Sequence, residues 1–277
     1  MNNYVRKVKK AFWLINLYRL DRAYRRFLNT NLNQCVRLNI EENPAAAAID
    51  LVSVTFNCIH TVRQQIRLTR KYLEDSFCLT ITDNSTDRKC REEIRRLCEA
   101  EKIAYIGLPP NPYRKTKCSN SHGAALDWIW RNYLSARPTA HFGFLDHDIY
   151  PVRRTSIVKN LSGRKVHGAL QVREQRWYLW AGFCFFERPA VQDVELSFRP
   201  IEDLDTGGRN FQTLYSRLQQ SNLIFPAQQY HQLRDGDLKQ ADQFETLGDW
   251  IHTFNASQWI EVDDGKEKLV EKLLAKY

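Results

Sequence analysis

No stretch of this 277-residue chain stays apolar over the ~20 residues that a membrane-spanning helix requires. The apolar segment from Ala11 to Leu17 is followed by arginines rather than by the small residues of a secretory cleavage site. We therefore expect a cytoplasmic protein. None of the seven cysteines forms a C-x-x-C pair, which argues against a zinc site or a redox pair of that type, so we expect reduced, mostly buried thiols.

Two common nucleotide-binding motifs are also missing. No G-x-G-x-x-G follows the first expected strand, which argues against a dinucleotide-dependent dehydrogenase or a methyltransferase with that loop. No G-x-x-x-x-G-K-[ST] occurs, which argues against a P-loop enzyme. The net positive charge is concentrated at the N-terminus, because residues 1–26 hold eight Lys or Arg against the single acid Asp21, a net +7 of the chain's formal +9, and the remainder is nearly neutral. A nucleic-acid channel needs basic residues spread over its surface, so we expect no nucleic-acid partner.

The basic residues at the N-terminus alternate with apolar ones at helical spacing. This pattern predicts a basic amphipathic helical arm over residues 1–38, with a break near Asn16, where the apolar stripe changes face. Residues 39–48, which contain Glu-Glu-Asn-Pro and four alanines, are typical of a linker. Two alternatives stay open for residues 4–28. They either bind an anionic membrane surface, which would place the protein on the inner face of a membrane, or pack against the body of the protein or a second subunit.

Strand-like and helix-like periods alternate through the first part of the body. The expected strands are residues 50–56, 77–82, 103–106 and 141–145, and the expected helices are residues 61–74, 87–102 and 119–135. This alternation predicts an α/β fold with a mostly parallel central sheet and helices on both faces. After Pro151 the alternation is lost, and we expect strands at 166–173 and 177–186 and helices at 209–220 and 266–276. We expect one domain with two halves, 49–153 and 154–277.

Two aspartates directly follow the last strand of this alternation. In an extended chain Asp146 and Asp148 project to one side and His147 to the other. Their hard oxygens suit Mn²⁺ or Mg²⁺ and leave coordination positions for diphosphate oxygens. The D-x-D spacing recurs at 203/205 and 235/237, but only the first pair ends an apolar strand. The sequence therefore predicts a metal site at the carboxyl edge of the sheet, where ligands of such sheets bind.

Four motifs in this region resemble the nucleotide-binding half of GT-A glycosyltransferases, particularly the family-2-like group. They are Thr55-Phe56-Asn57, Asp83-Asn84-Ser85, Ser121-His122-Gly123-Ala-Ala-Leu126 and Leu145-Asp-His-Asp-Ile-Tyr-Pro151. The resemblance covers residues 51–153. It implies a GT-A fold, a nucleotide-diphospho-sugar donor, Mn²⁺ or Mg²⁺ as cofactor, and a glycan, lipid or protein acceptor.

The resemblance also implies roles for individual residues. Thr55, Asn57, Asp83, Ser85, His122 and Asp146 would bind the donor, with Asp83 reading the base and His122 near the ribose or diphosphate. A helix N-terminus at His122 suits an anion on physical grounds as well. Plainer alternatives remain, because residues 83–87 also fit a turn with a helix N-cap and His122 fits an ordinary polar residue.

The second half of the chain contains candidates for the acceptor side and for a third metal ligand. Trp177, Trp180 and Gly182 suit a sugar-binding platform, although the tryptophans equally fit a core. His252 would complete the metal site with Asp146 and Asp148, or serve a structural role.

The predicted catalytic base is Asp205, with Asp203 as second choice. Asp205 precedes Thr-Gly-Gly, where the backbone can approach a ligand, although a carboxylate there also fits an N-cap. Two other functions remain open. One is a sugar-phosphate nucleotidyltransferase, which the lack of a glycine-rich basic loop after the first strand disfavours. The other is a membrane-associated scaffold, which has no need for the paired aspartates. Homo-oligomerisation also stays open.

Overall fold

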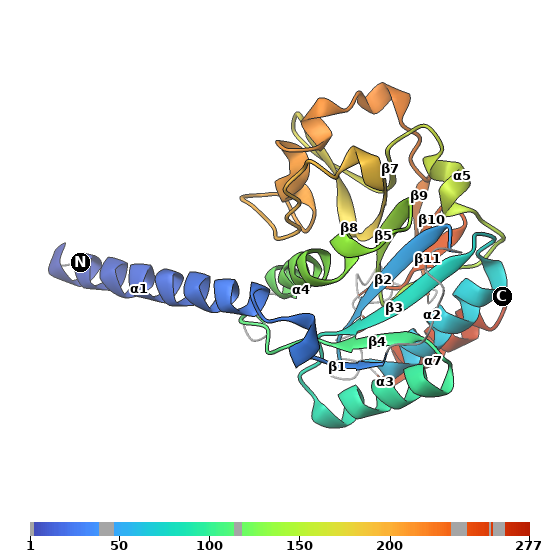
Figure 1. The fold of residues 1–277 in the computed structure, drawn as a ribbon, viewed down its shortest axis with the longest axis horizontal. Coiled ribbons are helices and arrows are strands. Elements are labelled where there is room, and N and C mark those ends of the chain that lie inside the picture. Colours follow the sequence, from blue (N-terminus) through green and yellow to red (C-terminus); the bar gives the residue numbers. More distant parts are fainter. Residues whose placement is uncertain (1–2, 39–46, 114–117, 234–242, 255, 257–263) are drawn as a thin grey trace.

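A seven-stranded mixed sheet forms the centre of the body in the computed structural model, which describes residues 3–38, 47–113, 118–233, 243–254, 256 and 264–277 (Figure 1). The strand order is β1-β4-β3-β2-β5-β8-β7. The four middle strands are parallel: β4 (Ala104–Gly107), β3 (Phe77–Asp83), β2 (Ile49–Thr55) and β5 (His141–Asp146). The outer strands β1 (Val36–Leu38), β8 (Arg176–Glu187) and β7 (Val166–Arg173) pair antiparallel. Every residue of β2 is buried, as expected of a strand covered on both faces.

Helices cover both faces of this sheet. On one face α2 (Ile59–Tyr72) and α3 (Arg88–Ala100) pack through Val62, Ile66 and Ile94 against apolar residues of β2, β3 and β4. On the other face α4 (Cys118–Asn132) packs through Leu126 and Trp128. The α/β fold predicted from sequence is thereby confirmed, including the mostly parallel middle of the sheet. The bounds of the elements predicted between residues 49 and 150 differ from the observed ones by three residues or fewer, whereas the α-helix described within the arm predicted over residues 1–38 runs only from Asn3 to Leu28.

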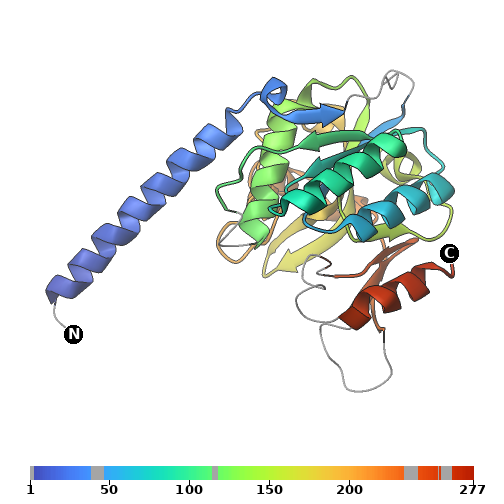
Figure 2. The same ribbon diagram turned by 90° about the horizontal axis from the view of Figure 1, so that it is seen from below.

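The N-terminal arm is one continuous helix, α1 (Asn3–Leu28), so the predicted break near Asn16 is wrong. Its last turns dock on α4, where Tyr24 and Phe27 are buried. Figures 1 and 2 show the rest of α1 projecting away from the body. Residues 36–38, at the end of the predicted arm, form the edge strand β1, while most of the predicted linker 39–48 lies outside the described residues. No described helix is long and apolar enough to cross a membrane.

A second, four-stranded antiparallel sheet lies at the carboxyl end of β5. Its order is β6 (Ile149–Pro151), β11 (Trp250–His252), β10 (Gln243–Leu247) and β9 (Gln228–Gln232). Near it lie the short helix α5 (Ile157–Leu161) and the last helix α7 (Asp264–Leu274), which packs on α2 through Leu68, Val270 and Leu274. Short 3₁₀ turns are η1 (Leu32–Gln34), η3 (Leu134–Ala136) and η4 (Arg188–Ala190).

The helix predicted over residues 209–220 is wrong. The chain there forms separate 3₁₀ turns, η5 (Gly208–Phe211), η6 (Tyr215–Arg217) and η7 (Gln220–Asn222). Tertiary contacts override the local helical pattern, because the Asn210 carboxamide accepts the N–H of Ser197 at 2.8 Å. The Tyr215 ring, fully buried, packs 5.3 Å from that of Trp177. These contacts hold the segment against β8 as separate turns instead of one helix.

Candidate active site

A cavity of about 430 Å³ opens at the carboxyl ends of the parallel strands, where the two sheets meet. This volume is typical of a small-ligand site. Among the residues that the structure describes, its lining includes five carboxylates and one Lys or Arg, Arg173. The carboxylates are Asp146, Asp148, Asp203, Asp205 and Glu245. An anionic ligand such as a diphosphate would be repelled by this lining unless a cation were bound with it.

Asp146 and Asp148 lie at the floor of the cavity, where β5 turns into β6. One ligand atom from each of Asp146, His147 and Asp148 lies within 4.8 Å of the other two. Because the chain turns here instead of remaining extended, His147 does not point to the opposite side as predicted. Its Nδ1 accepts the N–H of Phe56 at 3.1 Å and lies 3.2 Å from the Thr55 hydroxyl, so it braces the end of β2.

The Asp148 carboxylate is buried and only partly satisfied. Oδ2 accepts the N–H of Ala256 at 3.1 Å, whereas Oδ1 has no close hydrogen-bond partner among the described residues and lies 3.5 Å from Nε2 of His252. Burial alone would raise the pKa of Asp148, but His252 beside it outweighs burial and holds this pKa well below its usual range. The carboxylate therefore stays ionised, as a metal ligand must.

His252 faces Asp148 from β11. Its Nδ1 lies 2.8 Å from a carboxylate oxygen of Glu245, and its ring stacks on Trp180 with centroids 4.8 Å apart. Burial would lower the pKa of His252, but the two carboxylates raise it to about 9. A cation beside Asp148 would therefore take the place of the proton on Nε2, because a histidine ligand is neutral. The orphaned oxygen of Asp148, the facing nitrogen of His252 and the carboxylate of Asp146, which clusters with Asp148, all line this cavity. These residues fit a divalent cation such as Mn²⁺ or Mg²⁺, and the structure thus brings the predicted metal ligands to one cavity.

The N-terminal turn of α4 forms another wall of the cavity. Ser119, Ser121 and His122 line it. Nε2 of His122 is buried without a hydrogen-bond partner among the described residues. Backbone N–H groups at a helix start favour an anion. The structure places His122 where the sequence predicted it.

The other predicted donor residues, Thr55, Asn57, Asp83 and Ser85, do not line the cavity. Asp83 is fully buried, and its carboxylate accepts the Tyr105 hydroxyl and the Ser85 N–H, each at 2.8 Å. The structure therefore gives Asp83 a role in holding the loop after β3, which corresponds to the turn that the sequence left open.

Asn57 braces the same loop from the neighbouring strand. It adopts a left-handed backbone conformation with φ of 49°, and its Oδ1 accepts the N–H groups of Thr86 and Asp87 at 3.0 Å. Its own N–H donates to the Ser85 hydroxyl at 2.8 Å. Phe56 and Asn84, the chain neighbours of the predicted residues, line the cavity in their place.

The aromatic pair predicted for the acceptor side is split. Trp180 lines the cavity, and Gly182 lies beneath its indole, where an added Cβ would be 2.3 Å from two ring atoms. Trp177 belongs to the core, because it is buried against Tyr215 and Phe225 and does not line the cavity.

Asp203 and Asp205 both line the cavity and are exposed. Asp203 accepts from Arg176 at 2.5 Å, and this hydrogen bond lowers the pKa of Asp203. Among the described residues, the Asp205 carboxylate accepts only the adjacent N–H of Thr206 at 2.7 Å, so its second oxygen has no hydrogen-bond partner there. The N-cap of the following turn is Gly207, so Asp205 is not the helix cap that the sequence left open. The 235/237 pair lies outside the described residues.

Sequence reasoning missed Glu245, Tyr230 and Phe254, which line the cavity from the second sheet and the chain after it. A signal for part of this wall exists in the sequence. Gly248-Asp249 lies between the alternating segments 243–247 and 250–252, which is typical of a two-residue hairpin turn. That hairpin register places Glu245 directly opposite His252.

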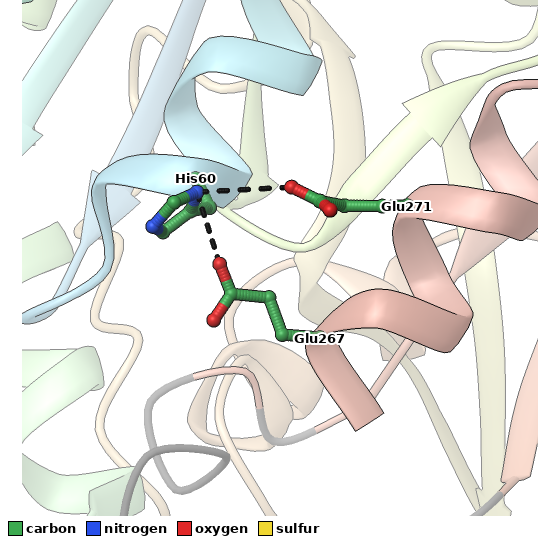
Figure 3. A group of neighbouring side chains, drawn as sticks. All are labelled: His60, Glu267 and Glu271. Carbon is green, nitrogen blue, oxygen red and sulfur yellow. Dashed lines mark ion pairs between the residues drawn. The ribbon is translucent and has the colours of Figure 1, made fainter. Parts of the chain in front are cut away.

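A second cluster of titratable groups lies outside the cavity, between α2 and α7 (Figure 3). His60 Nδ1 is 2.9 Å from a carboxylate oxygen of Glu267 and 3.9 Å from one of Glu271. All three side chains are 30% exposed or more, and none lines the cavity. This cluster is a surface ion-pair group that fastens the last helix to the body.

No protein-family model and no curated protein matches the chain. Among solved structures it is similar to the mannosyltransferase PcManGT from Pyrobaculum calidifontis in complex with GDP-Man and Mn²⁺ (12% identity, TM-score 0.38, 68% of this chain and 56% of that one). It is also similar to the galactosyltransferase LgtC in complex with donor and acceptor sugar analogs (10%, 0.36, 53% and 60%). A third is glucosyl-3-phosphoglycerate synthase from Mycobacterium tuberculosis with Mn²⁺, UDP and glucosyl-3-phosphoglycerate (16%, 0.35, 56% and 62%).

The matched region spans less than two thirds of each of these solved chains, and about a third of the bifunctional glycosyltransferase WbbM (33%) and of TarS (30%). The chain is similar to these structures. At sequence identities of 10–16% and TM-scores of 0.35–0.38, this similarity assigns the chain neither a family nor a function.

Proposed function

We propose that this protein is a metal-dependent glycosyltransferase of the GT-A type, which moves a sugar from a nucleotide-diphosphate donor to an acceptor hydroxyl. One observation carries the proposal. Asp146, Asp148 and His252 converge in an acidic cavity that also receives the N-terminal turn of α4, at the carboxyl ends of parallel strands. A dianionic nucleotide-sugar needs both a cation and hydrogen-bonding N–H groups. This cavity supplies ligands for the cation, and the N-terminal turn of α4 supplies the N–H groups.

The residues on the metal side would hold the donor diphosphate. A divalent cation bound there would neutralise the negative charge that develops on the departing nucleoside diphosphate. His122 and the first N–H groups of α4 would bind the ribose or the diphosphate. Phe56 and Asn84 line the cavity beside the residues that the sequence assigned to the nucleoside, and we assign the nucleoside contact to them.

The residues across the cavity would bind the acceptor. Trp180 offers an aromatic face for a glycan or for a lipid-linked sugar. In an inverting transfer Asp205 would take the proton of the acceptor hydroxyl, because its second carboxylate oxygen is unengaged by the described residues. Asp203 is second choice, since Arg176 occupies it. The anomeric configuration of the product, measured by NMR, distinguishes inversion from retention.

The projecting part of α1 supports an anionic membrane surface as partner. Leu14, Ile15, Leu17 and Tyr18 are 44–68% exposed, and exposed Lys9 and Lys10 precede them along the helix. Basic groups near anionic lipid contribute up to ~1 kcal/mol each, and salt weakens them. We expect co-sedimentation with phosphatidylserine vesicles at low salt, weakened by K9E/K10E and unchanged by K268E/K272E on α7. Equal binding by all three proteins would leave self-association or packing as the role of the arm.

The nucleotidyltransferase alternative is weaker on these observations. After β2 the chain enters α2 directly, and residues 57–61 contain neither glycine nor Lys or Arg to surround a triphosphate. A thermal-shift screen of UDP-, GDP-, dTDP- and CMP-sugars, each with and without Mn²⁺, tests the proposal. We expect a Mn²⁺-dependent shift with at least one donor. No shift with any donor would contradict it.

A further inference from the structure

Glu245 lies directly behind His252 in the second sheet. The strands β10 and β11 are joined by the turn at Gly248-Asp249, and their register pairs Glu245 with His252. A carboxylate oxygen of Glu245 is 2.8 Å from Nδ1 of His252, and both residues are only 6% exposed. A buried carboxylate at this distance is a strong, charge-assisted hydrogen-bond acceptor.

The His252 ring is held on its remaining sides as well. Trp180 stacks on it at 28° between planes, and Phe254 lies tilted against it with centroids 4.3 Å apart. With Nδ1 committed to Glu245 as a donor, the lone pair used for a metal lies on Nε2, which faces the orphaned oxygen of Asp148 at 3.5 Å. Neither ring rotation nor the other tautomer would keep these contacts.

We infer that Glu245 is a positioning residue, which orients His252 and directs its Nε2 to the divalent cation beside Asp148. This inference rests on the proposed function, because the role that it gives to Glu245 concerns the cation required by the proposed function. Glu245 acts through His252 and takes no part in bond making. A carboxylate behind a histidine ligand also makes the imidazole a better donor, and loss of such a partner typically weakens metal binding by ~10- to 100-fold.

The test compares Glu245→Gln with the parent protein and with Glu187→Gln. Glu245→Gln keeps the side-chain shape and removes the charge, while Glu187→Gln removes one carboxylate at the far end of β8, outside the cavity. Mn²⁺ affinity is measured from the electron paramagnetic resonance signal of free Mn²⁺. Spin-echo modulation of bound Mn²⁺ then reports whether a histidine nitrogen coordinates it, with His252→Ala as the reference without that nitrogen.

We expect Glu245→Gln to bind Mn²⁺ ~10-fold more weakly or worse and to lose much of the nitrogen modulation. Glu187→Gln should match the parent in both. Glu245→Asp, which restores the charge at a shorter reach, should recover part of the affinity. Parent-like affinity and modulation in a Glu245→Gln protein with an unchanged unfolding midpoint would overturn this inference alone. Absence of Mn²⁺ binding by the parent would overturn both the inference and the metal dependence of the proposed function.

Discussion

Replacing Gly182 by alanine tests the geometry of the aromatic wall without any ligand. The indole of Trp180 folds along β8 over Gly182, and an added Cβ would lie 2.3 Å from two indole carbons and 2.8 Å from a third. Carbon atoms pack at ~3.5–4.0 Å, so the ring must move by roughly 1 Å or more. Its other face is stacked on His252, which leaves little room for that movement.

Two costs add in this variant. Overpacking a well-packed site costs ~1–3 kcal/mol of unfolding free energy, and a disturbed aromatic stack costs a further ~0.5–1.5 kcal/mol. Urea unfolding of Gly182→Ala should therefore show a loss of about 2 kcal/mol or more. Trp180→Phe removes the ring atoms that clash, so in the double variant the cost of the alanine should shrink by at least ~1 kcal/mol.

The double-mutant cycle decides whether the cost comes from this contact. Gly182→Ala with parental stability would refute the placement of Trp180. So would a cost that is equal in the presence and absence of Trp180→Phe, because the two positions would then be independent.

Three further outcomes follow from the described contacts. Asp205→Ala should lower kcat by ~10²–10⁴ with donor binding retained, measured by product formation and by titration of the donor; an unchanged kcat would place the base elsewhere. Asp83→Asn should lower the free energy of unfolding, measured in urea, by ~1–3 kcal/mol, because the Tyr105 hydroxyl donates to the Asp83 carboxylate below the cavity. The nucleotide preference should not change. A changed base preference would support the role in base recognition that the sequence predicted for Asp83. Burial raises the pKa of Asp127 to about 6, so protonated Asp127 contributes stability that is complete below its unfolded pKa and lost as the pH rises through 6. Relative to Asp127→Asn, the parent should therefore lose ~1 kcal/mol of unfolding free energy between pH 5 and 7.5. Parallel stability curves of the two proteins would contradict this.

The parallel half of the fold could be predicted because each strand has a local signature. The residues of β2 and β5 form short apolar runs, and polar residues follow each run at one edge of the sheet, so Asp146 and Asp148 could be predicted to line a cavity there. His122 was identifiable for a similar reason, since it lies in the first turns of a helix that follows a strand.

Other parts of the site depend on contacts that no local pattern encodes. Residues 209–220 have helical spacing, but contacts with Ser197 and Trp177 break them into separate turns. Asp83 and Asn84 are neighbours in sequence, yet only Asn84 lines the cavity. The Asp83 carboxylate instead accepts a hydrogen bond from the hydroxyl of Tyr105, which lies on the adjacent strand. Tertiary packing therefore decides which of two neighbouring residues lines the cavity.

Titration of the donor found in the thermal-shift screen tests the central claim most directly. Calorimetry would compare the parent, Asp146→Asn, Asp148→Asn and the surface control Asp193→Asn, each with and without Mn²⁺. The amide keeps the side-chain shape but removes the charge that holds the cation. We predict Mn²⁺-dependent donor binding by the parent and by Asp193→Asn, and its loss in both site variants while each of them still unfolds cooperatively. Equal donor affinity in all four proteins would contradict the assignment of Asp146 and Asp148 as the metal ligands of a glycosyltransferase.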